Sequence, residues 1–531
     1  MSEGDRRLVR SSAVIGLGTA LSRVTGFLRV SALAALGFGR LTDVYNVANS
    51  TPNILYELLL GGILTATLVP LYVEHHQRGD RTAGDAINTL VLVALAAVTV
   101  IGVVGAPWIV DVYLLRARGP DLAVQRALAT DLLRWFMPQV FFYGVTTLAT
   151  AQLNARHRFA AAAFAPALNN VVAIAVLLAL PRLADGDLGV QRVADDPVLV
   201  ALLGAGTTAG IAAMALVLLP ALRRAGVSFR WRFELRHPAV RRLLSLSGWS
   251  VGYVVANQIA FWVVLVLAYR GEGDPSVYLA AFTFFQLPHG LFAVSIMTAV
   301  APELADAAAR GDRERLRDRF AQGLRLMLCA VMPSTVVLVV LARPIVNALL
   351  GYGAFSSRDA ALTSQTLGAF AVGLVCFSLY LYTLRAFYAE QDTRTPFLIN
   401  AGENAMNVAL ALVLYPVLGV RGLAWAWTAA YVVASVVALT TLRSRWRRLE
   451  GRETLRTARR LALACGALAV VAWGTARLLT YATPTRALVA TAAALVLGGA
   501  AFLASGRALR VGELSLIVRG LARRPAASPG V

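Results

Sequence analysis

Fourteen apolar stretches, each of roughly twenty residues, follow one another along this chain and constrain its fold more than any other feature. A stretch of that length with few charges is long enough for a helix to cross a bilayer. Because lipid offers no partner to backbone N–H and C=O groups, such stretches are expected to be helical. The mean hydropathy of +0.65 and the hydrophobic fraction of 58% agree. We therefore predict an all-α polytopic membrane protein with about 14 transmembrane helices.

The predicted spans are placed where apolar residues run without interruption. They cover residues 13–36, 44–72, 87–113, 129–152, 160–181, 197–221, 244–269, 277–304, 322–349, 361–388, 397–415, 421–443, 459–481 and 485–505. An even number of spans puts both termini on the same side of the membrane. The first span follows Arg6, Arg7 and Arg10 as in a secretory signal, but a cleavable signal would not contain Arg23 and Arg29, so we predict a retained helix.

Arginine placement predicts the orientation. All 50 lysine-plus-arginine residues are arginines, and the net charge is +21. The densest clusters lie at 232–242, 310–319 and 443–460, all on the side of the N-terminus. By the positive-inside rule both termini are cytoplasmic, in the cytoplasmic (inner) membrane.

An internal repeat predicts the domain organisation. The motif RGDR follows a proline by eight residues twice, at 78–81 and again at 310–313, an offset of 232. Asn169 and Asn404 share an offset of 235, and the Thr-Ala pairs at 208 and 428 share only 220, which indicates a shorter outer loop in the second copy. We predict two parallel six-helix lobes, 1–225 and 226–450, followed by helices thirteen and fourteen and a basic cytoplasmic tail, 451–531.

The first span, around LSRVTGFLRV at 21–30, holds two charges where lipid is expected. At about 100° per residue, Ser22, Arg23, Thr25, Gly26 and Arg29 share one broad sector of the helix. Bulky apolar residues take the other sector, so this sector is predicted to face a polar cavity. An arginine in mid-membrane costs about 2.5–3.5 kcal/mol on insertion scales, which demands an explanation.

Two explanations remain open for these arginines. One is a structural ion pair with Asp43, Glu57 or Glu403. The other is an anion site, because guanidinium groups bind phosphate and carboxylate through paired hydrogen bonds. Further polar residues inside spans could line a cavity or join helices; they are Asn53, Gln139, Asn169, Asn170, Asn257, Gln258, Gln286, Asn404 and Asn407.

Several classes of function are not indicated. The cysteines lack CxxC spacing and the five histidines form no ligand pattern, so we predict no metal site and no cofactor. No nucleotide-binding motif or nucleophile–base arrangement appears, and we predict that the chain is not an enzyme. The basic residues lie in short loops between spans, so no nucleic acid partner is expected.

Four segments together resemble the MurJ/MviN family. They are LSRVTGFLR at 21–29, TDVYNVANSTPNILYELLLGG at 42–62, QLNARHRFAAAAFAPALNN at 152–170 and QLPHGLFAVSIMTAVAPELA at 286–305. The family consists of lipid II flippases in the MOP exporter superfamily. The arginine-only, alanine-rich composition is most similar to its actinobacterial members.

The resemblance implies a function and a set of binding residues. Lipid II, an undecaprenyl-diphosphate-linked peptidoglycan precursor, would be moved from the inner to the outer leaflet by alternating access. Membrane lipids, and other cell-wall or division proteins, are further candidate partners. Arg23, Arg29, Asp43 and Asn53 match family positions. With Ser22 and Thr25 from the polar sector, they are the predicted substrate-binding residues.

Two departures and three alternatives qualify the resemblance. Tyr56 and Thr283 stand where well-known proteobacterial members carry arginines, so the cavity charge rests on Arg23 and Arg29. A flippase for another polyprenyl-diphosphate glycan would use the same arginines. A MATE-like exporter of soluble cations would instead prefer acidic residues, and a non-transporting scaffold would need no polar sector.

Overall fold

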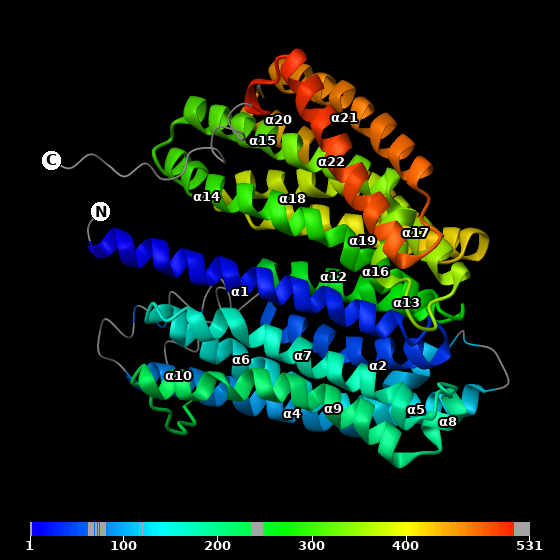
Figure 1. Ribbon diagram of the computed structural model, residues 1–531. Coiled ribbons are helices and arrows are strands. Elements are labelled where there is room, and N and C mark those ends of the chain that lie inside the picture. The colour runs from blue at the N-terminus through cyan, green and yellow to red at the C-terminus, as the bar shows by residue number, and fades with distance from the viewer. Residues whose placement is uncertain are drawn as a thin grey trace. The chain divides into compact units, whose positions relative to one another are not determined.

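A computed structural model describes residues 3–61, 68, 72, 74, 81–115, 117, 121–234, 248–447, 449 and 451–514. For 3–15, 60, 61, 81, 83, 248 and 250 it describes the backbone alone. Within these ranges the chain forms helices joined by short connections, and no described residue lies in a β-strand. The prediction of an all-α polytopic membrane protein is confirmed (Figure 1).

The predicted number of 14 spans is not confirmed. Ten described helices are long and apolar enough to cross a membrane, and an eleventh span results if a pair bent by 43° counts as one. The helices that match the first, second and fourth predicted spans do not meet that test. The first of these helices carries the arginines discussed above, and the described part of the second ends at Gly61.

The chain divides into two compact units, Met1–Ser276 and Val277–Val531. The helices of the first unit are α1 (Glu3–Ala34), α2 (Arg40–Tyr56), the π-helix η1 (Glu57–Gly61), α4 (Arg81–Leu114), α5 (Leu122–Phe136), α6 (Pro138–Ala155), α7 (Ala160–Leu183), α8 (Val190–Ala194), α9 (Pro197–Leu216), α10 (Leu218–Arg224) and α12 (Gly248–Ala268). The division falls in α13 (Asp274–Pro288). The lobe boundary predicted at 225 therefore stays a prediction.

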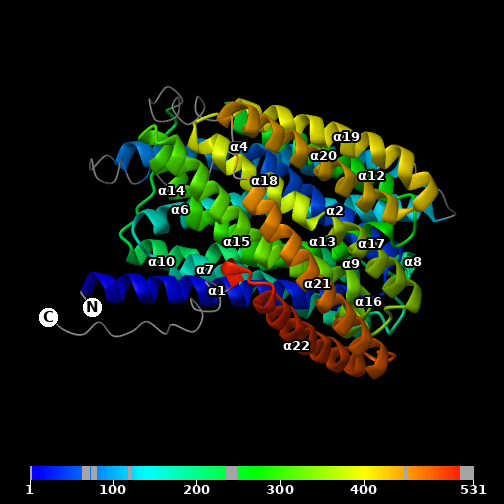
Figure 2. The ribbon, with the colours of Figure 1, turned by 90° about the horizontal axis from the view of Figure 1, so that it is seen from above.

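The second unit continues from α13. Its helices are the π-helix η3 (His289–Ala293), α14 (Val294–Ala309), α15 (Arg313–Val340), α16 (Ala342–Leu350), α17 (Ser357–Val372), α18 (Leu374–Ala389), α19 (Arg394–Leu418), α20 (Val420–Trp446), α21 (Gly451–Leu479) and α22 (Pro484–Ala508). The last two helices run side by side as a hairpin (Figure 2).

The helix boundaries repeat with the spacing found in the sequence. The π-helices η1 and η3 begin at Glu57 and His289, separated by the same offset as the two RGDR motifs. Arg81 and Arg313, again with that offset, both lie in long helices, α4 and α15. A π-turn is rare, so its presence at the same place in both copies supports duplication. Pro70 and residues 78–80 of the first RGDR motif lie outside the described residues.

The later helices repeat with a slightly longer offset that then shortens. Helices α7 and α19 end at Leu183 and Leu418, with the same offset as Asn169 and Asn404. In the first copy, the connection from α7 to α9 contains the short helix α8. In the second copy, the connection from α19 to α20 is Gly419 alone. The sequence-based prediction of a shorter loop in the second copy is thus explained.

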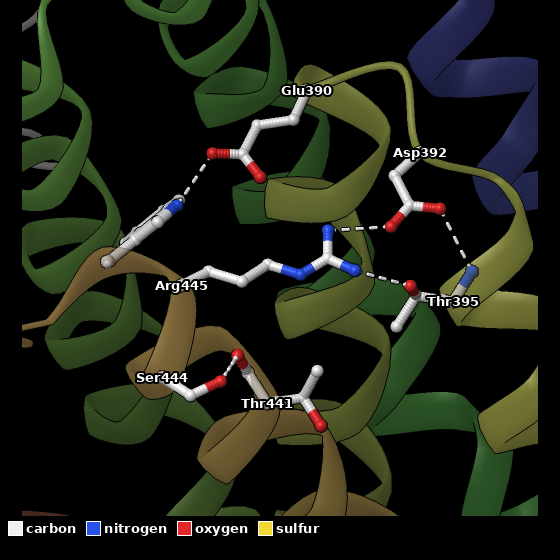
Figure 3. Close-up of polar contacts among 7 residues, drawn as sticks. Glu390, Asp392, Thr395, Thr441, Ser444 and Arg445 are labelled. Atoms are coloured by element: carbon white, nitrogen blue, oxygen red, sulfur yellow. Dashed lines mark hydrogen bonds and ion pairs between the residues drawn. The ribbon is translucent and has the colours of Figure 1, made fainter.

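One loop of the second unit is fixed to the end of α20 by polar contacts (Figure 3). Arg445 Nη1 lies 2.7 Å from Asp392 Oδ2, and its Nη2 donates to Thr395 Oγ1 at 2.6 Å. The Trp446 indole N–H donates to Glu390 Oε1 at 2.7 Å. Burial alone would raise the pKa of Asp392, but hydrogen bonds from Thr395 and the Arg445 charge outweigh it and hold that pKa below its ordinary value.

We expect Arg445→Ala to lower the free energy of unfolding by about 0.5–1.5 kcal/mol, because both partners are only partly exposed. A carboxylate with a depressed pKa stabilises the fold above its ordinary pKa of about 3.9, and this contribution is lost as the pH falls through the folded value. The difference in melting temperature between wild type and variant should therefore shrink at acid pH. Tryptophan fluorescence of the purified protein in detergent measures it.

Ser444→Ala is the matched control, since Ser444 Oγ donates only to Thr441 O of its own helix, at 2.7 Å (Figure 3). Its melting temperature should stay close to that of the wild type. An Arg445→Ala effect of equal size at neutral and acid pH would contradict the assigned ion pair.

Candidate functional site

Small residues bring α1 close to α7 in the first unit, and the two helices lie side by side in both views (Figures 1 and 2). A Cβ atom added at Gly18 would lie 2.6 Å from Ala163 Cβ and 2.8 Å from its carbonyl oxygen. One added at Gly26 would lie 3.4 Å from Asn170 Nδ2. Close backbone approach through small residues is the usual way in which membrane helices pack.

Asn170 of α7 holds this contact with its amide. Its Nδ2 donates to Thr25 Oγ1 at 3.1 Å and to Ser22 O at 3.2 Å. Thr25 is 8% exposed, and its hydroxyl also donates to Leu21 O at 2.8 Å. The predicted polar sector is therefore partly occupied by helix packing, and substrate binding by Ser22 and Thr25 stays a prediction.

The two α1 arginines flank this packed face. Arg23 is exposed and Arg29 is half-buried. No ion pair joins either guanidinium to a carboxylate of the described residues, so the ion-pair explanation has no support in this part of the chain. Arg29 instead acts electrostatically on the hydroxyl groups of Tyr45 in α2 and Tyr143 in α6.

Tyrosines of α2 and α6 form contacts within the first unit that sequence reasoning did not predict. The Tyr45 hydroxyl pairs with Thr207 Oγ1 at 3.1 Å. Tyr56 pairs with Thr147 Oγ1 at 2.8 Å, and its ring centroid lies 5.1 Å from that of Tyr143. Tyr45 is 5% exposed and its hydroxyl is already paired with Thr207, whereas Tyr56 and Tyr143 are half-buried.

Asp43 is fully buried at the start of α2 and accepts hydrogen bonds at both carboxylate oxygens. Gly273 N donates to Oδ2 at 2.7 Å, while Ser276 Oγ and N donate to Oδ1 at 2.8 and 3.3 Å. The carboxylate thereby caps the first turn of α13, where an anion is favoured. These contacts give Asp43 a structural role, and substrate binding by it stays a prediction.

Residues near Asp43 form further contacts between α2 and residues 269–276. Asn46 Nδ2 donates to Ser276 Oγ at 3.0 Å. Arg40 Nη1 donates to Tyr269 O at 3.1 Å, and its guanidinium lies 5.8 Å from the centre of the Tyr269 ring. Sequence reasoning could not find these pairs, because their members are about 230 residues apart.

The remaining candidate residues are engaged locally. Asn53 is half-buried and donates to Asn49 O at 2.9 Å. Thr283 donates to Leu279 O of its own helix at 2.9 Å. Glu403 is 4% exposed inside the second unit. No group of three or more His, Cys, Asp or Glu side chains that could hold a metal ion occurs in the described part of the chain.

Comparison with known proteins agrees with this arrangement. A family model described as "Lipid II flippase MurJ" matches residues 33–491. The chain belongs to the MurJ family. The matched family is one of membrane flippases and not of catalytic enzymes. The family model begins after Arg23 and Arg29, so the match does not include these two arginines.

Individual relatives extend the match over nearly the whole chain. A probable lipid II flippase MurJ of Rhizobium meliloti (strain 1021) is 28% identical, over 98% of this chain and 97% of its own. The lipid II flippase MurJ of Burkholderia cenocepacia is 30% identical, over 78% of this chain and 80% of its own.

Two solved structures share the fold. A lipid II flippase MurJ in an inward closed conformation has a TM-score of 0.76 at 21% identity, covering 96% of this chain and all of its own. An inward-facing MATE transporter of the MOP superfamily has a TM-score of 0.65 at 16% identity, covering 79% of this chain and 94% of its own. The MOP superfamily fold predicted from the MurJ resemblance is thus confirmed.

Gly18→Val should destabilise the protein by about 1–3 kcal/mol, because the added side chain collides with Ala163 and forces α1 away from α7. Gly16→Val is the matched control, since a Cβ atom at Gly16 meets nothing within 4 Å. Thermal unfolding in detergent compares the two. Equal melting temperatures for both variants would contradict the close α1–α7 contact.

Asp43→Asn should destabilise the protein by about 1–3 kcal/mol. The new NH2 group cannot accept a hydrogen bond, so one buried donor, Gly273 N or the Ser276 donors, would lose its acceptor. The exposed Asp131, which pairs with Arg134 at 3.4 Å, provides the control Asp131→Asn, expected to change stability by less than about 0.5 kcal/mol. Both are measured by thermal unfolding. An unchanged melting temperature for Asp43→Asn would argue against the cap on α13.

Proposed function

We propose that this protein moves lipid II from the inner to the outer leaflet of the cytoplasmic membrane, for peptidoglycan synthesis. One observation carries the proposal: in a member of the MurJ family, Arg23 and Arg29 of α1 have no ion-pair partner among the described residues. Arginines at membrane depth without such a partner are costly unless a ligand or water satisfies them. Lipid II brings a diphosphate, which suits them.

The chemistry of recognition follows from the guanidinium group of Arg29. A guanidinium binds two phosphate oxygens through parallel hydrogen bonds, and Arg29 is half-buried with no ion-pair partner among the described residues. Arg23, which is more exposed, would meet the diphosphate or a peptide carboxylate as the headgroup enters. Ser22, Thr25, Asn53 and Asp43 would line or brace this path.

Transport would proceed by alternating access, with no covalent step. The two six-helix lobes, 1–225 and 226–450, would rock about the bound headgroup while the prenyl chain stays in lipid. Helices thirteen and fourteen with the tail, 451–531, stand outside the repeat. The membrane potential or an ion gradient would supply the energy.

Orientation and partners belong to the same proposal. The arginine clusters at 310–319 and 443–460 place both termini in the cytoplasm by the positive-inside rule. Membrane lipids surround the helices, and other cell-wall or division proteins are candidate partners. A MATE-like exporter of cations is disfavoured because Arg23 and Arg29, the charges in the apolar part of α1, are positive.

In cells that carry the double variant Arg23→Ala/Arg29→Ala, we expect the amount of lipid II on the outer leaflet to fall to about one tenth of the wild-type amount or less. Each lost charge-assisted contact is worth about 1.5–3 kcal/mol. The native gene is depleted in the host cell and replaced by wild type or variant. Lipid II accessible on the outer leaflet is then scored. Arg23→Lys/Arg29→Lys should retain more activity because it keeps the charge.

Arg134→Ala is the matched control, because Arg134 is exposed, lies in α5 and already pairs with Asp131. It should rescue as well as wild type. Full rescue by the double alanine variant would overturn the anion site. Failure of a well-folded wild type to expose lipid II, together with exposure of another polyprenyl-diphosphate glycan, would overturn lipid II as the substrate.

A further inference from the structure

A cavity of about 650 Å³ lies in the second unit, where the turn between α21 and α22 meets α16 and the start of α17. Helix α16 lies beside this turn in Figure 2. The side chains that matter in its wall are Arg343, Asn347, Ser356, Ser357, Arg477 and Thr483. None of these residues belongs to the candidate site on α1.

The charge of this cavity is positive. Arg343 and Arg477 line it, and no acidic residue is among its described lining residues. Neither arginine forms an ion pair with a residue in the described ranges. Arg343 Nη2 donates to Ser357 O at 3.2 Å, and the Arg477 guanidinium lies 4.7 Å from the centre of the Trp473 ring. Each guanidinium has five N–H donors, so most are left for a ligand.

Two long helices begin at the cavity wall. Helix α17 starts at Ser357 after the cap Ser356, and α22 starts at Pro484 after the cap Thr483. Helix N-termini carry partial positive charge, which adds to that of the arginines. Asp359 offsets part of this charge at α17, where its carboxylate accepts from Ser356 N at 2.9 Å.

The cavity is held in shape by contacts within the unit. Asn347 Nδ2 of α16 donates to Tyr481 O in the α21–α22 turn at 3.3 Å. A Cβ atom added at Gly351 would lie 3.3 Å from Pro484 Cγ, so the end of α16 is packed against the start of α22. Preorganised donors bind an anion at a smaller entropic cost than mobile ones.

The position of the cavity favours a lipid ligand. It lies at the end of α15 and α21 opposite to their arginine-rich starts. Close to it, the α21 side chains Trp473 and Leu478 are 52% and 85% exposed. Tryptophan is enriched at the headgroup level of membranes, and an exposed leucine there belongs in lipid. In the orientation proposed above, this is the outer leaflet.

We propose that this cavity binds the phosphate of an acidic phospholipid of the outer leaflet, with Arg343 and Arg477 as its two cationic contacts. The acyl chains lie along the exposed apolar face of α21, and the phosphate enters between α16 and the α21–α22 turn. The bound lipid thereby fastens this hairpin to α16 and α17. The site is separate from lipid II transport, which rests on α1.

The test uses the full chain, purified and reconstituted in nanodiscs that contain equal amounts of phosphatidylglycerol and phosphatidylcholine. Native mass spectrometry then counts the lipids that the protein retains. Wild type should retain phosphatidylglycerol in preference. The double variant Arg343→Gln/Arg477→Gln should lose this retained lipid by about tenfold or more, since hydrogen bonds from a charged donor to phosphate are the strong ones.

The matched control is Arg358→Gln/Arg486→Gln. These two arginines lie near the starts of α17 and α22, which border the cavity, but they are not among its lining residues. It should retain lipid as wild type does. Arg343→Lys/Arg477→Lys keeps the charge, is less disruptive to folding, and should retain an intermediate amount. A monodisperse elution profile and an unchanged melting temperature verify that each variant is folded.

Two results would overturn the proposal. Equal retention of phosphatidylglycerol by the cavity variant and the control variant would show that the arginines do not bind lipid. Displacement of the lipid by millimolar inorganic phosphate or glycerol phosphate, with no preference left for the diacyl form, would assign the site to a soluble phosphate compound. Loss of the lipid in the cavity variant, with normal rescue of lipid II exposure, would support the proposal. It would also show that the cavity site is not needed for lipid II transport.

Discussion

Every polar group inside an apolar helix bundle must find its partner within the protein, and this constraint organises the whole structure. The Asn170 amide spans α7 and α1, the Tyr45 hydroxyl reaches Thr207, and Gln139 donates to Thr208 at 3.2 Å. Each pair joins two helices that apolar packing alone would leave free to slide in lipid. Arg23 and Arg29 have no ion-pair partner among the described residues, and our proposal assigns them to a ligand.

The predicted duplication would account for helix boundaries that recur in two halves of different sequence. Helix starts and ends recur at corresponding places in both halves, and the rare π-turns η1 and η3 recur with them. A π-turn leaves a locally irregular backbone, which is a feature of functional sites. Its retention in both copies suits a transporter whose helices must bend, whereas a rigid scaffold would have no use for it.

The sequence could predict the all-helical membrane fold and single out the unusual arginines, since both depend on composition along one segment, whereas the number of 14 spans is not confirmed. It could not predict the partners of Asp43, because Gly273 and Ser276 lie about 230 residues away and only the folded first unit brings them together. It also could not tell which residues in the polar sector of α1 pack against α7 and which do not. Periodicity places Ser22, Thr25 and Arg29 on one side of a helix, but it does not say where α7 will lie.

By itself, the sequence determined that this chain is an all-α membrane protein of the MurJ type with two cations in its first apolar span, because hydropathy and charge are local properties. The tertiary structure decided which polar residues are used to hold helices together and which remain available. Thr25 and Asp43 are taken up by Asn170 and by the start of α13, while Arg29 has no ion-pair partner among the described residues. That division depends on distances between helices, and distances between helices are set only when the bundle packs.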